Sequence, residues 1–315
     1  MLNQLDFFIN INVDARKDLG EDSWCYCFGP NGGMIAAFDG CGGSGSRKHE
    51  FYTGRSEAYM ASRMCAGAFF DAFRELLFDG TDNLQPEEAI ARCAEYCQSV
   101  FTAYKPPKGQ TSRIRSSMLS TLPTTTAAAI LRQRNGLMEV TAFWAGDSRI
   151  YVLSPKGLAQ VSTDDSDEND PYETDGMMTN SITADRAPKM NVKTVLVPYP
   201  AIVFAATDGC FAYYTTPMEF EGMLLSALME SQSAADWEAR LKESIGQVAG
   251  DDYTLVMAVL GFGSFEALRQ ALWQRYSFLY ENYLTHLQEI PPEDTATRQA
   301  LWNSYRAEYT KYIEG

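Results

Sequence analysis

The chain has 315 residues, of which 45% are hydrophobic, so it can form one large domain or two with a substantial buried core. Its formal charge of −15 disfavours nucleic acids and anionic membranes as partners, because phosphate groups are bound through clustered Lys and Arg. No apolar run reaches ~18 residues, and the N-terminus lacks the pattern of a signal peptide, so we expect a cytoplasmic protein without a membrane span.

The expected elements alternate between strands and helices along the chain. Strands are expected at 34–38, 138–145, 149–154, 201–206 and 253–260, and helices at 55–79, 86–104, 217–230 and 234–247. The strands 138–145 and 149–154 alternate in a way that predicts a hairpin with one buried face. Helix blocks between strands that lack βαβ spacing indicate an α+β fold rather than a parallel sheet.

Two polar segments interrupt these elements. Residues 105–121 are polar and basic, and the acidic run 164–171 carries too many charges to pack into a core. We expect both to be loops. Whether the acidic run is simply solvated or also shapes the choice of substrate stays open at this point.

Residues 264–315 show helical spacing in two blocks, separated by Pro291 and Pro292. Each block carries a stripe of large apolar side chains: Phe265, Leu268, Leu272, Tyr276, Leu279 and Tyr283 in the first, and Trp302, Tyr305, Tyr309 and Tyr312 in the second. The pattern predicts a helical hairpin. Such a stripe packs on its own domain more often than on a partner, and the alternative is a surface for a cognate kinase or a second copy of the chain.

The seven cysteines show no zinc spacing, and their odd number argues against a complete disulfide framework. Cys25 and Cys27 alternate along an expected strand, and Cys93 and Cys97 fall one helical turn apart, so we expect buried free thiols.

The two histidines do not support a catalytic triad or a zinc site, because neither lies at a suitable spacing from acidic or nucleophilic residues. His49 lies in a polar stretch, and we expect it to be a solvated loop residue. Nucleophile-elbow, phosphate-loop and dinucleotide-binding motifs are also absent from the sequence.

Three acidic motifs lie far apart in the chain: Phe38-Asp39-Gly40-Cys41-Gly42-Gly43, Ala206-Thr207-Asp208-Gly209 and Gly250-Asp251-Asp252-Tyr253-Thr254. Each aspartate lies at the end of an expected strand. Any single Asp-Gly is more simply explained as a tight turn. In combination, carboxylates on rigid strand ends are suitable ligands for Mg²⁺ or Mn²⁺, which prefer oxygen donors.

Together with further matches in the same order, these motifs resemble the metal-dependent protein phosphatases of the PPM (type 2C) family, in particular its bacterial-type members. The further matches are Gly20-Glu21-Asp22-Ser23, Gly54-x-x-Glu57-Ala58-x-x-Ala61-Ser62, Thr124-Thr125-Thr126-Ala127, Trp144-Ala145-Gly146-Asp147-Ser148-Arg149, Asp164-Asp165-Ser166 and Asn180-Ser181-Ile182-Thr183. The resemblance runs from about Gly20 to Gly261. It implies a four-layer αββα sandwich with two central antiparallel sheets, to which the C-terminal helical hairpin is added.

The resemblance also implies the site and the reaction. Asp39, Asp208 and Asp251 would bind two Mn²⁺ or Mg²⁺ ions directly, Gly40 would contribute its carbonyl oxygen, and Glu21 and Asp22 would bind mostly through water. A hydroxide that bridges the two ions would then attack phosphorus in line. Asp147 would contribute to a third ion, but the family's other ligand for that ion is replaced by Ala212, so a third site is in doubt.

The sequence departs from the family at two further positions. Cys41 stands where eukaryotic-type members have a histidine that protonates the leaving group, and we interpret it as a small apolar filler and leave the general acid unassigned. Asp165 stands where histidine is usual. The phosphate-binding arginine falls at Arg16 or Lys17, and the planar fork of arginine makes Arg16 the better candidate, with a solvated basic pair as the alternative.

The sequence therefore predicts a catalytic domain over 1–262 and a helical extension over 263–315. The predicted function is hydrolysis of phosphoserine and phosphothreonine in proteins, with a role in signalling. The alternatives are a pseudophosphatase, which binds phosphoproteins without turnover, and a phosphatase of small phosphorylated metabolites.

Overall fold

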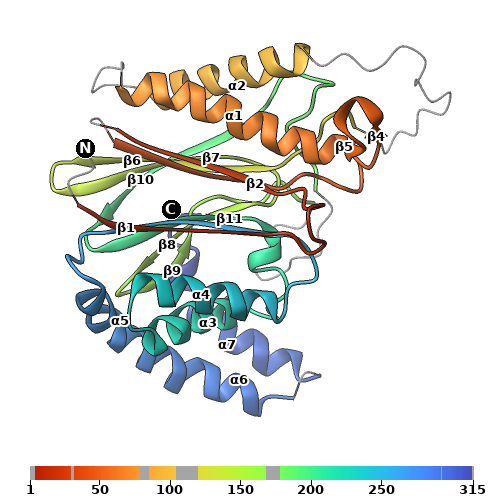
Figure 1. The fold of residues 1–315 in the computed structure, drawn as a ribbon. Coiled ribbons are helices and arrows are strands. Elements are labelled where there is room, and N and C mark those ends of the chain that lie inside the picture. The colour runs from red at the N-terminus through yellow and green to blue at the C-terminus, as the bar shows by residue number, and fades with distance from the viewer. Residues whose placement is uncertain are drawn as a thin grey trace.

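The computed structural model describes residues 4–29, 32–78, 85–103, 120–167, 178–291 and 293–313. Two five-stranded antiparallel sheets lie face to face, with helices on the outer side of each (Figure 1). The predicted α+β fold and its four αββα layers are therefore confirmed. No helix among the described residues is long and apolar enough to cross a membrane.

The first sheet has the order β1-β12-β11-β8-β9. Its strands are β1 (Leu5–Val13), β12 (Tyr253–Leu260), β11 (Ala201–Ala206), β8 (Arg149–Ser154) and β9 (Gly157–Gln160). All residues of β11 and β12 are buried, because this sheet is covered on both faces. The strand predicted at 201–206 agrees with β11 at both ends.

The second sheet has the order β10-β7-β6-β3-β2. Its strands are β10 (Asn191–Pro198), β7 (Leu137–Ala145), β6 (Thr126–Arg134), β3 (Gly32–Phe38) and β2 (Ser23–Gly29), and a separate pair, β4 (Lys48–His49) and β5 (Arg55–Ser56), lies before the first long helix. β1 and β2 are edge strands of the two sheets, and the ring centroids of Phe8 on β1 and Tyr26 on β2 lie 4.3 Å apart.

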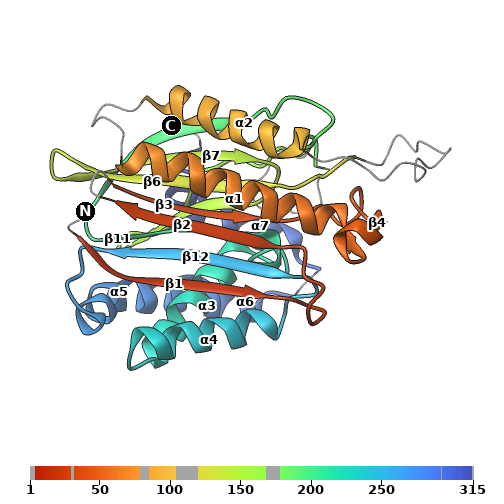
Figure 2. The ribbon, with the colours of Figure 1, turned by 45° about the horizontal axis from the view of Figure 1, so that its top comes forward.

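The helices of the segment 57–102 cover the second sheet, and those of the segment 217–309 lie on the outer side of the first (Figure 2). The helices are α1 (Glu57–Phe78), α2 (Pro86–Thr102), α3 (Pro217–Glu230), α4 (Ala234–Gly246), α5 (Phe265–Leu279), α6 (Thr285–Glu289) and α7 (Thr295–Tyr309), with short helices η1 (Glu50–Tyr52), η2 (Asp208–Cys210) and η3 (Tyr280–Leu284) between them. Side chains cap α3, α4 and α5, where Thr216, Ser233 and Ser264 each accept a backbone N–H of the first turn.

The predicted hairpin of 138–145 and 149–154 is wrong. β7 pairs with β6 and β10 in the second sheet, whereas β8 pairs with β11 and β9 in the first. The chain therefore crosses from one sheet to the other at 146–148. Both strands are buried on both faces in their central parts, and for this reason their sequences could not indicate which strand they pair with.

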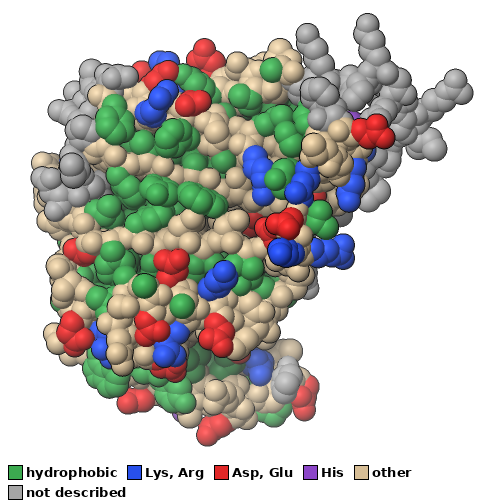
Figure 3. Space-filling view, viewed as in Figure 1, with side chains coloured by type: hydrophobic (Ala, Val, Ile, Leu, Met, Phe, Trp, Pro, Cys, Tyr) green, Lys and Arg blue, Asp and Glu red, His purple; other side chains and the backbone are tan. Residues whose placement is uncertain are grey.

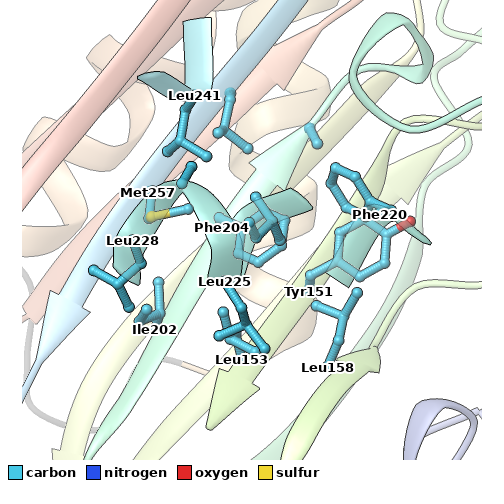
Figure 4. Close-up of a cluster of buried hydrophobic side chains, with 14 of the residues drawn as sticks. Tyr151, Leu153, Leu158, Ile202, Phe204, Phe220, Leu225, Leu228, Leu241 and Met257 are labelled. Carbon is cyan, nitrogen blue, oxygen red and sulfur yellow. The ribbon is translucent and has the colours of Figure 1, made fainter. Parts of the chain in front are cut away.

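Three apolar clusters fill the spaces between the layers, one between the sheets and one under each helical layer. Figure 4 shows the cluster under α3 and α4, in which Phe204, Tyr151 and Phe220 meet side chains from both helices. The cysteines behave as expected, because all seven are free and buried. Cys97 and Cys65 bring α2 and α1 together, with 3.8 Å between their sulfur atoms.

The C-terminal aromatic stripe packs on the chain's own core. Trp302, Tyr305 and Tyr309 are at most 3% exposed and belong to the cluster beneath the first sheet. The helical hairpin is confirmed, with the short π-helical turn η3 between α5 and α6. The domain division at residue 262 remains a prediction. Residues 104–119 and 168–177, which include most of the expected loop 105–121 and the second half of the expected loop 164–171, lie outside the described residues, as does Pro292.

Candidate active site

Asp39 lies directly after β3, at the end of the second sheet. Its N–H donates to Thr125 Oγ1 at 3.2 Å, and its carbonyl oxygen accepts the N–H of Thr125 at 2.8 Å. A Cβ atom on Gly40 would lie 2.6 Å from the carbonyl oxygen of Ala58, so only glycine permits this close approach. The Asp-Gly pair is therefore not a hairpin turn, and it holds the carboxylate at the strand end.

Asp208 occupies the equivalent place after β11 in the first sheet. A Cβ atom on Gly209 would lie 2.0 Å from the carbonyl oxygen of Asp252, so this Asp-Gly pair also marks a close backbone approach. The preceding Thr207 joins β11 to β12: its N–H donates to the Thr254 carbonyl at 3.0 Å, and Thr254 N–H donates to its hydroxyl at 2.8 Å. The close approach of Gly209 to Asp252 and the hydrogen bonds between Thr207 and Thr254 thus bring the second and third acidic motifs together.

The predicted acidic pair Glu21 and Asp22 lies directly before β2. Asp22 is buried and accepts a hydrogen bond from Thr207 Oγ1 at 2.7 Å. The Asp252 carboxylate accepts the N–H groups of Glu21 at 2.6 Å and of Ala15 at 2.7 Å. Asp252 therefore fixes the segment that leads into the acidic pair, a role that the sequence analysis missed because it considered only the first aspartate of the doublet as a ligand.

Asp251, the first aspartate of that doublet, is exposed, and its Oδ1 accepts the N–H of Asp252 at 2.8 Å. It lines a cleft of about 360 Å³ together with Glu21 and Asp252. This volume lies within the roughly 300–1,000 Å³ range of small-molecule sites. The other predicted ligands are not among the described residues that line this cleft.

Asp147 lies on the segment that crosses between the sheets. This segment is clamped by Asp165, whose carboxylate accepts Gly146 N–H at 3.1 Å and whose N–H donates to Gly146 O at 3.0 Å. The Ser148 hydroxyl hydrogen-bonds with that of Thr125 at 2.6 Å, which connects the crossover to Asp39. The Oδ1 atom of Asp147 is buried and accepts no hydrogen bond from the described residues.

The acidic side chains at this end of the molecule destabilise one another's ionised form. Burial, and next the charge of Asp208, raise the pKa of Asp39 well above its ordinary value. Burial raises the pKa of Asp22 to about 8 and that of Asp208 to about 7, and it also raises the pKa of Asp147. None of these four forms an ion pair within the part of the chain that the structure describes. The charge of Arg149 opposes the rise in pKa of Asp147 and Asp208, but Arg149 pairs with Asp164 and not with the cluster.

The chemistry of these donors fits hard divalent cations. The ligands are all oxygen atoms, burial raises the pKa of Asp22, Asp39, Asp147 and Asp208, and Asp147 Oδ1 has no competing hydrogen bond among the described residues. Within those residues no three acidic, histidine or cysteine side chains converge closely enough to form a ready-made ion site. The carboxylates thus influence one another's charge, but among the described residues they do not lie close enough together to coordinate one ion.

The rim of the cleft carries three cations, Arg16, Lys48 and Arg55. Arg16 was predicted to bind phosphate, and its place on the cleft agrees with that prediction without testing it. Lys17 is exposed and is not among the described residues that line the cleft. Lys48 and Arg55 were not singled out by the sequence analysis, because a cation in a polar segment gives no signal of the cleft it will face.

His49 corrects the sequence analysis, because it is buried rather than solvated. Its Nε2 atom lies 2.8 Å from Glu57 Oε1, and Glu57 Oε2 accepts the N–H of Leu122 at 3.2 Å. The pair joins the start of α1 to the chain that leads into β6. Cys41 is buried beside Asp39, and burial raises the pKa of its thiol well above the ordinary value, so it stays protonated.

The comparisons with known proteins agree with this architecture. A family model described as protein phosphatase 2C matches residues 14–246. A comparison with curated protein sequences gave no match. Because the family model covers well over half of the chain, the chain belongs to the protein phosphatase 2C family, and the predicted enzyme class, a serine/threonine protein phosphatase, is confirmed.

Several solved bacterial phosphatases share the fold at low sequence identity. The Staphylococcus aureus serine/threonine phosphatase Stp1 has 15% identity and a TM-score of 0.56, over 82% of this chain and 95% of that one. The Mycobacterium smegmatis phosphatase MsPP, solved with cacodylate, has 14% identity and a TM-score of 0.58, over 82% and 100%. The Mycobacterium tuberculosis phosphatase PstP/Ppp has 16% identity and a TM-score of 0.54, over 81% and 98%.

Proposed function

We propose that this chain is a Mn²⁺- or Mg²⁺-dependent phosphatase that hydrolyses phosphoserine and phosphothreonine in proteins. One observation carries the proposal: Asp39, Asp208 and Asp22 come from strand ends of both sheets, burial raises the pKa of each, and the charge of Asp208 raises the pKa of Asp39 and Asp22 further, while none of the three has an ion-pair partner among the described residues. Burying several like charges together is unfavourable unless something neutralises them, and divalent cations do so with oxygen ligands.

The ligand set follows the sequence prediction. Two ions would be held by Asp39, Asp208 and Asp251, by the carbonyl oxygen of Gly40, and through water by Glu21 and Asp22. When bound, such ions supply a lowered pKa for a water nucleophile and neutralise charge on the phosphoryl oxygens. A third ion would have Asp147 but not the aspartate that Ala212 replaces, so its binding remains open.

The chain's own residues contribute position and charge. Thr125 holds the backbone of Asp39, and Ser148 holds the crossover that carries Asp147. Asp252 holds the backbone of Glu21. Arg16, on the rim, would offer its planar fork to the phosphoryl oxygens. Rigid placement of this kind lowers the entropic cost of bringing the reacting groups into line.

The test is hydrolysis of an aryl phosphate and of phosphoserine and phosphothreonine peptides by the purified full chain in Mn²⁺, in Mg²⁺ and in EDTA. Asp208→Asn should lower turnover at least about a hundredfold, because it removes a charge from the site without changing its shape. Glu243→Gln is the matched control, since Glu243 is an exposed acid on α4. Turnover that persists in EDTA would contradict the proposal.

Two alternatives give different results in the same assay. Mn²⁺ binding measured by calorimetry, with no turnover of any phosphorylated compound, would indicate a pseudophosphatase, which Cys41 and Ala212 would be consistent with. Faster hydrolysis of small phosphate esters than of phosphopeptides would indicate a phosphatase of metabolites.

A further inference from the structure

The cleft beside the acidic cluster has more positive charge on its rim than a single phosphate needs. Arg16, Lys48 and Arg55 all line it, and none of them forms an ion pair within the described parts of the chain. Figure 3 shows Lys and Arg side chains on both sides of an acidic patch at the edge of the molecule where α1 begins. Two of these cations, Lys48 and Arg55, lie on the small β4–β5 sheet.

Lys48 is placed by its neighbours on this small sheet. It pairs in register with Ser56, whose hydroxyl donates to Glu21 Oε1. The adjacent His49 is buried and anchored to Glu57, while Lys48 is exposed, as alternation along a strand requires. Burial raises the pKa of Glu21 and the charge of Lys48 opposes that rise, so the ammonium group lies within electrostatic range of the acidic site.

Arg55 is held more rigidly than a surface arginine usually is. Its guanidinium group lies over the ring of Tyr59, 4.6 Å from the ring centroid, and donates to the carbonyl oxygen of Asp18. Arg63 lies 3.5 Å from the centroid of the same ring and donates to Gly20 O at 3.1 Å. Arg55 is therefore fixed on the cleft, and ordering it on binding costs little entropy.

We propose that Lys48 and Arg55 select phosphoprotein segments that carry an acidic side chain next to the phosphorylated residue. This inference rests on the proposed function. The chain has a formal charge of −15, and Asp251 and Asp252 line the same cleft, so an acidic segment would be repelled without local positive charge. Metal ions and Arg16 would serve the phosphoryl group itself, which leaves Lys48 and Arg55 for a second anionic group.

The experiment compares two phosphothreonine peptides with the full chain in Mn²⁺. The acidic peptide has aspartates on both sides of the phosphothreonine. The second peptide is identical except that asparagine replaces these aspartates. We expect kcat/KM to be about three- to tenfold higher for the acidic peptide, since partly exposed ion pairs contribute modestly. This ratio should fall as the salt concentration rises. Lys48→Met and Arg55→Met should each lower the ratio, and the double variant should bring it close to one.

Lys156→Met is the matched control, because Lys156 is exposed at the turn between β8 and β9, at the opposite end of β8 from Asp147. It should leave the ratio unchanged. Arg55 also holds the Asp18 backbone, so if Arg55→Met does not fold, the exposed Lys48 still allows the test through Lys48→Met. Equal kcat/KM values for the two peptides would overturn the inference and leave the proposed function intact.

If neither peptide is hydrolysed, the proposed function fails. The inference that Lys48 and Arg55 favour acidic segments is then tested by binding alone. Fluorescence anisotropy of the same two peptides, labelled at one end, measures their affinities directly. Tighter binding of the acidic peptide that is lost in Lys48→Met would support the inference, and equal affinities would overturn it.

Discussion

Arg149 and Asp164 form a buried, bidentate ion pair directly behind the segment that carries Asp147. The Nη2 atom lies 2.7 Å from Oδ2, and the Nε atom lies 2.9 Å from Oδ1. The guanidinium group also lies 4.3 Å from the centroid of the Phe211 ring. Asp164 begins the acidic run that the sequence indicated as a loop too charged to pack, and the structure corrects this for its first two residues: Asp164 pairs with Arg149, and Asp165 clamps Gly146.

Replacing Asp164 by asparagine should therefore destabilise the fold strongly. Arg149 would keep its charge in a site that is only 3% exposed, and a buried charge without its partner costs about 3–5 kcal/mol. We expect a loss of unfolding free energy near the lower limit, about 3 kcal/mol, because the Asp164 side chain is 18% exposed. Urea denaturation measures the loss. The control is Glu230→Gln at the exposed pair with Arg240, where less than about 1 kcal/mol is expected. Equal losses of unfolding free energy at Asp164 and Glu230 would contradict the expectation that the pair with the buried Arg149 contributes more than the exposed pair.

The C-terminal helices should contribute to stability through Glu221 on α3. This fully buried carboxylate accepts two hydrogen bonds from Arg275, each of 2.7 Å, one from Tyr305 Oη at 2.6 Å and one from Leu158 N–H at 3.1 Å. Glu221→Gln should cost about 3–5 kcal/mol, because it leaves the Arg275 charge unpaired. The double variant Glu221→Gln/Arg275→Met should lose less than Glu221→Gln alone. Chemical denaturation of the full chain tests this. A double variant that loses as much unfolding free energy as Glu221→Gln alone, or more, would contradict it.

The glycine after Asp39 should tolerate no side chain. A Cβ atom there would lie 2.6 Å from Ala58 O and 2.7 Å from Glu21 O, both of which are backbone atoms that cannot move independently. Gly40→Ala should cost about 1–3 kcal/mol and weaken Mn²⁺ binding in calorimetry. Gly67→Ala on α1 is the control, because nothing lies within 4 Å of the added Cβ, and it should stabilise the helix by about 0.5–1 kcal/mol. Gly40→Ala with unchanged stability would show that the backbone there is not tightly packed.

The stability of the metal-free protein should fall as the pH rises. Burial raises the pKa of Asp22 to about 8 and of Asp208 to about 7, whereas an unfolded aspartate titrates near ~3.9. Between about pH 4 and 8 the folded state thus keeps protons that the unfolded chain has released, so the unfolding free energy decreases with pH. Thermal unfolding in EDTA across this range measures the effect.

Bound Mn²⁺ should remove this pH dependence, because the ions neutralise the carboxylates that protons otherwise occupy. The same series in Mn²⁺ is therefore the comparison, and Asp208→Asn should reduce the slope in EDTA. A metal-free protein that gains stability as the pH rises from 5 to 8 would contradict the assignment of these aspartates as a mutually repelling cluster.

The sequence by itself determined the strands at 34–38, 138–145, 149–154, 201–206 and 253–260, most helices and the candidate ligands. Buried runs such as 201–206 end where an aspartate begins a turn, and this pattern is local, so it is visible without a structure. The aromatic spacing of 302–309 likewise predicted a helix with one buried face. These features depend on residues within one or two turns of chain, where periodicity and turn chemistry decide the conformation.

Only the tertiary structure decided which of these elements meet. Local alternation suggested that 138–145 and 149–154 pair, yet they belong to different sheets, because both are buried on two faces and find other neighbours. His49 is buried against Glu57, and Asp164 forms an ion pair with the buried Arg149, although both lie in polar sequence. Lys48 and Arg55 join Arg16 on one cleft, although they lie 32 and 39 residues after it in the chain. Charge pairing and cleft formation depend on contacts between distant segments, and no local pattern encodes them.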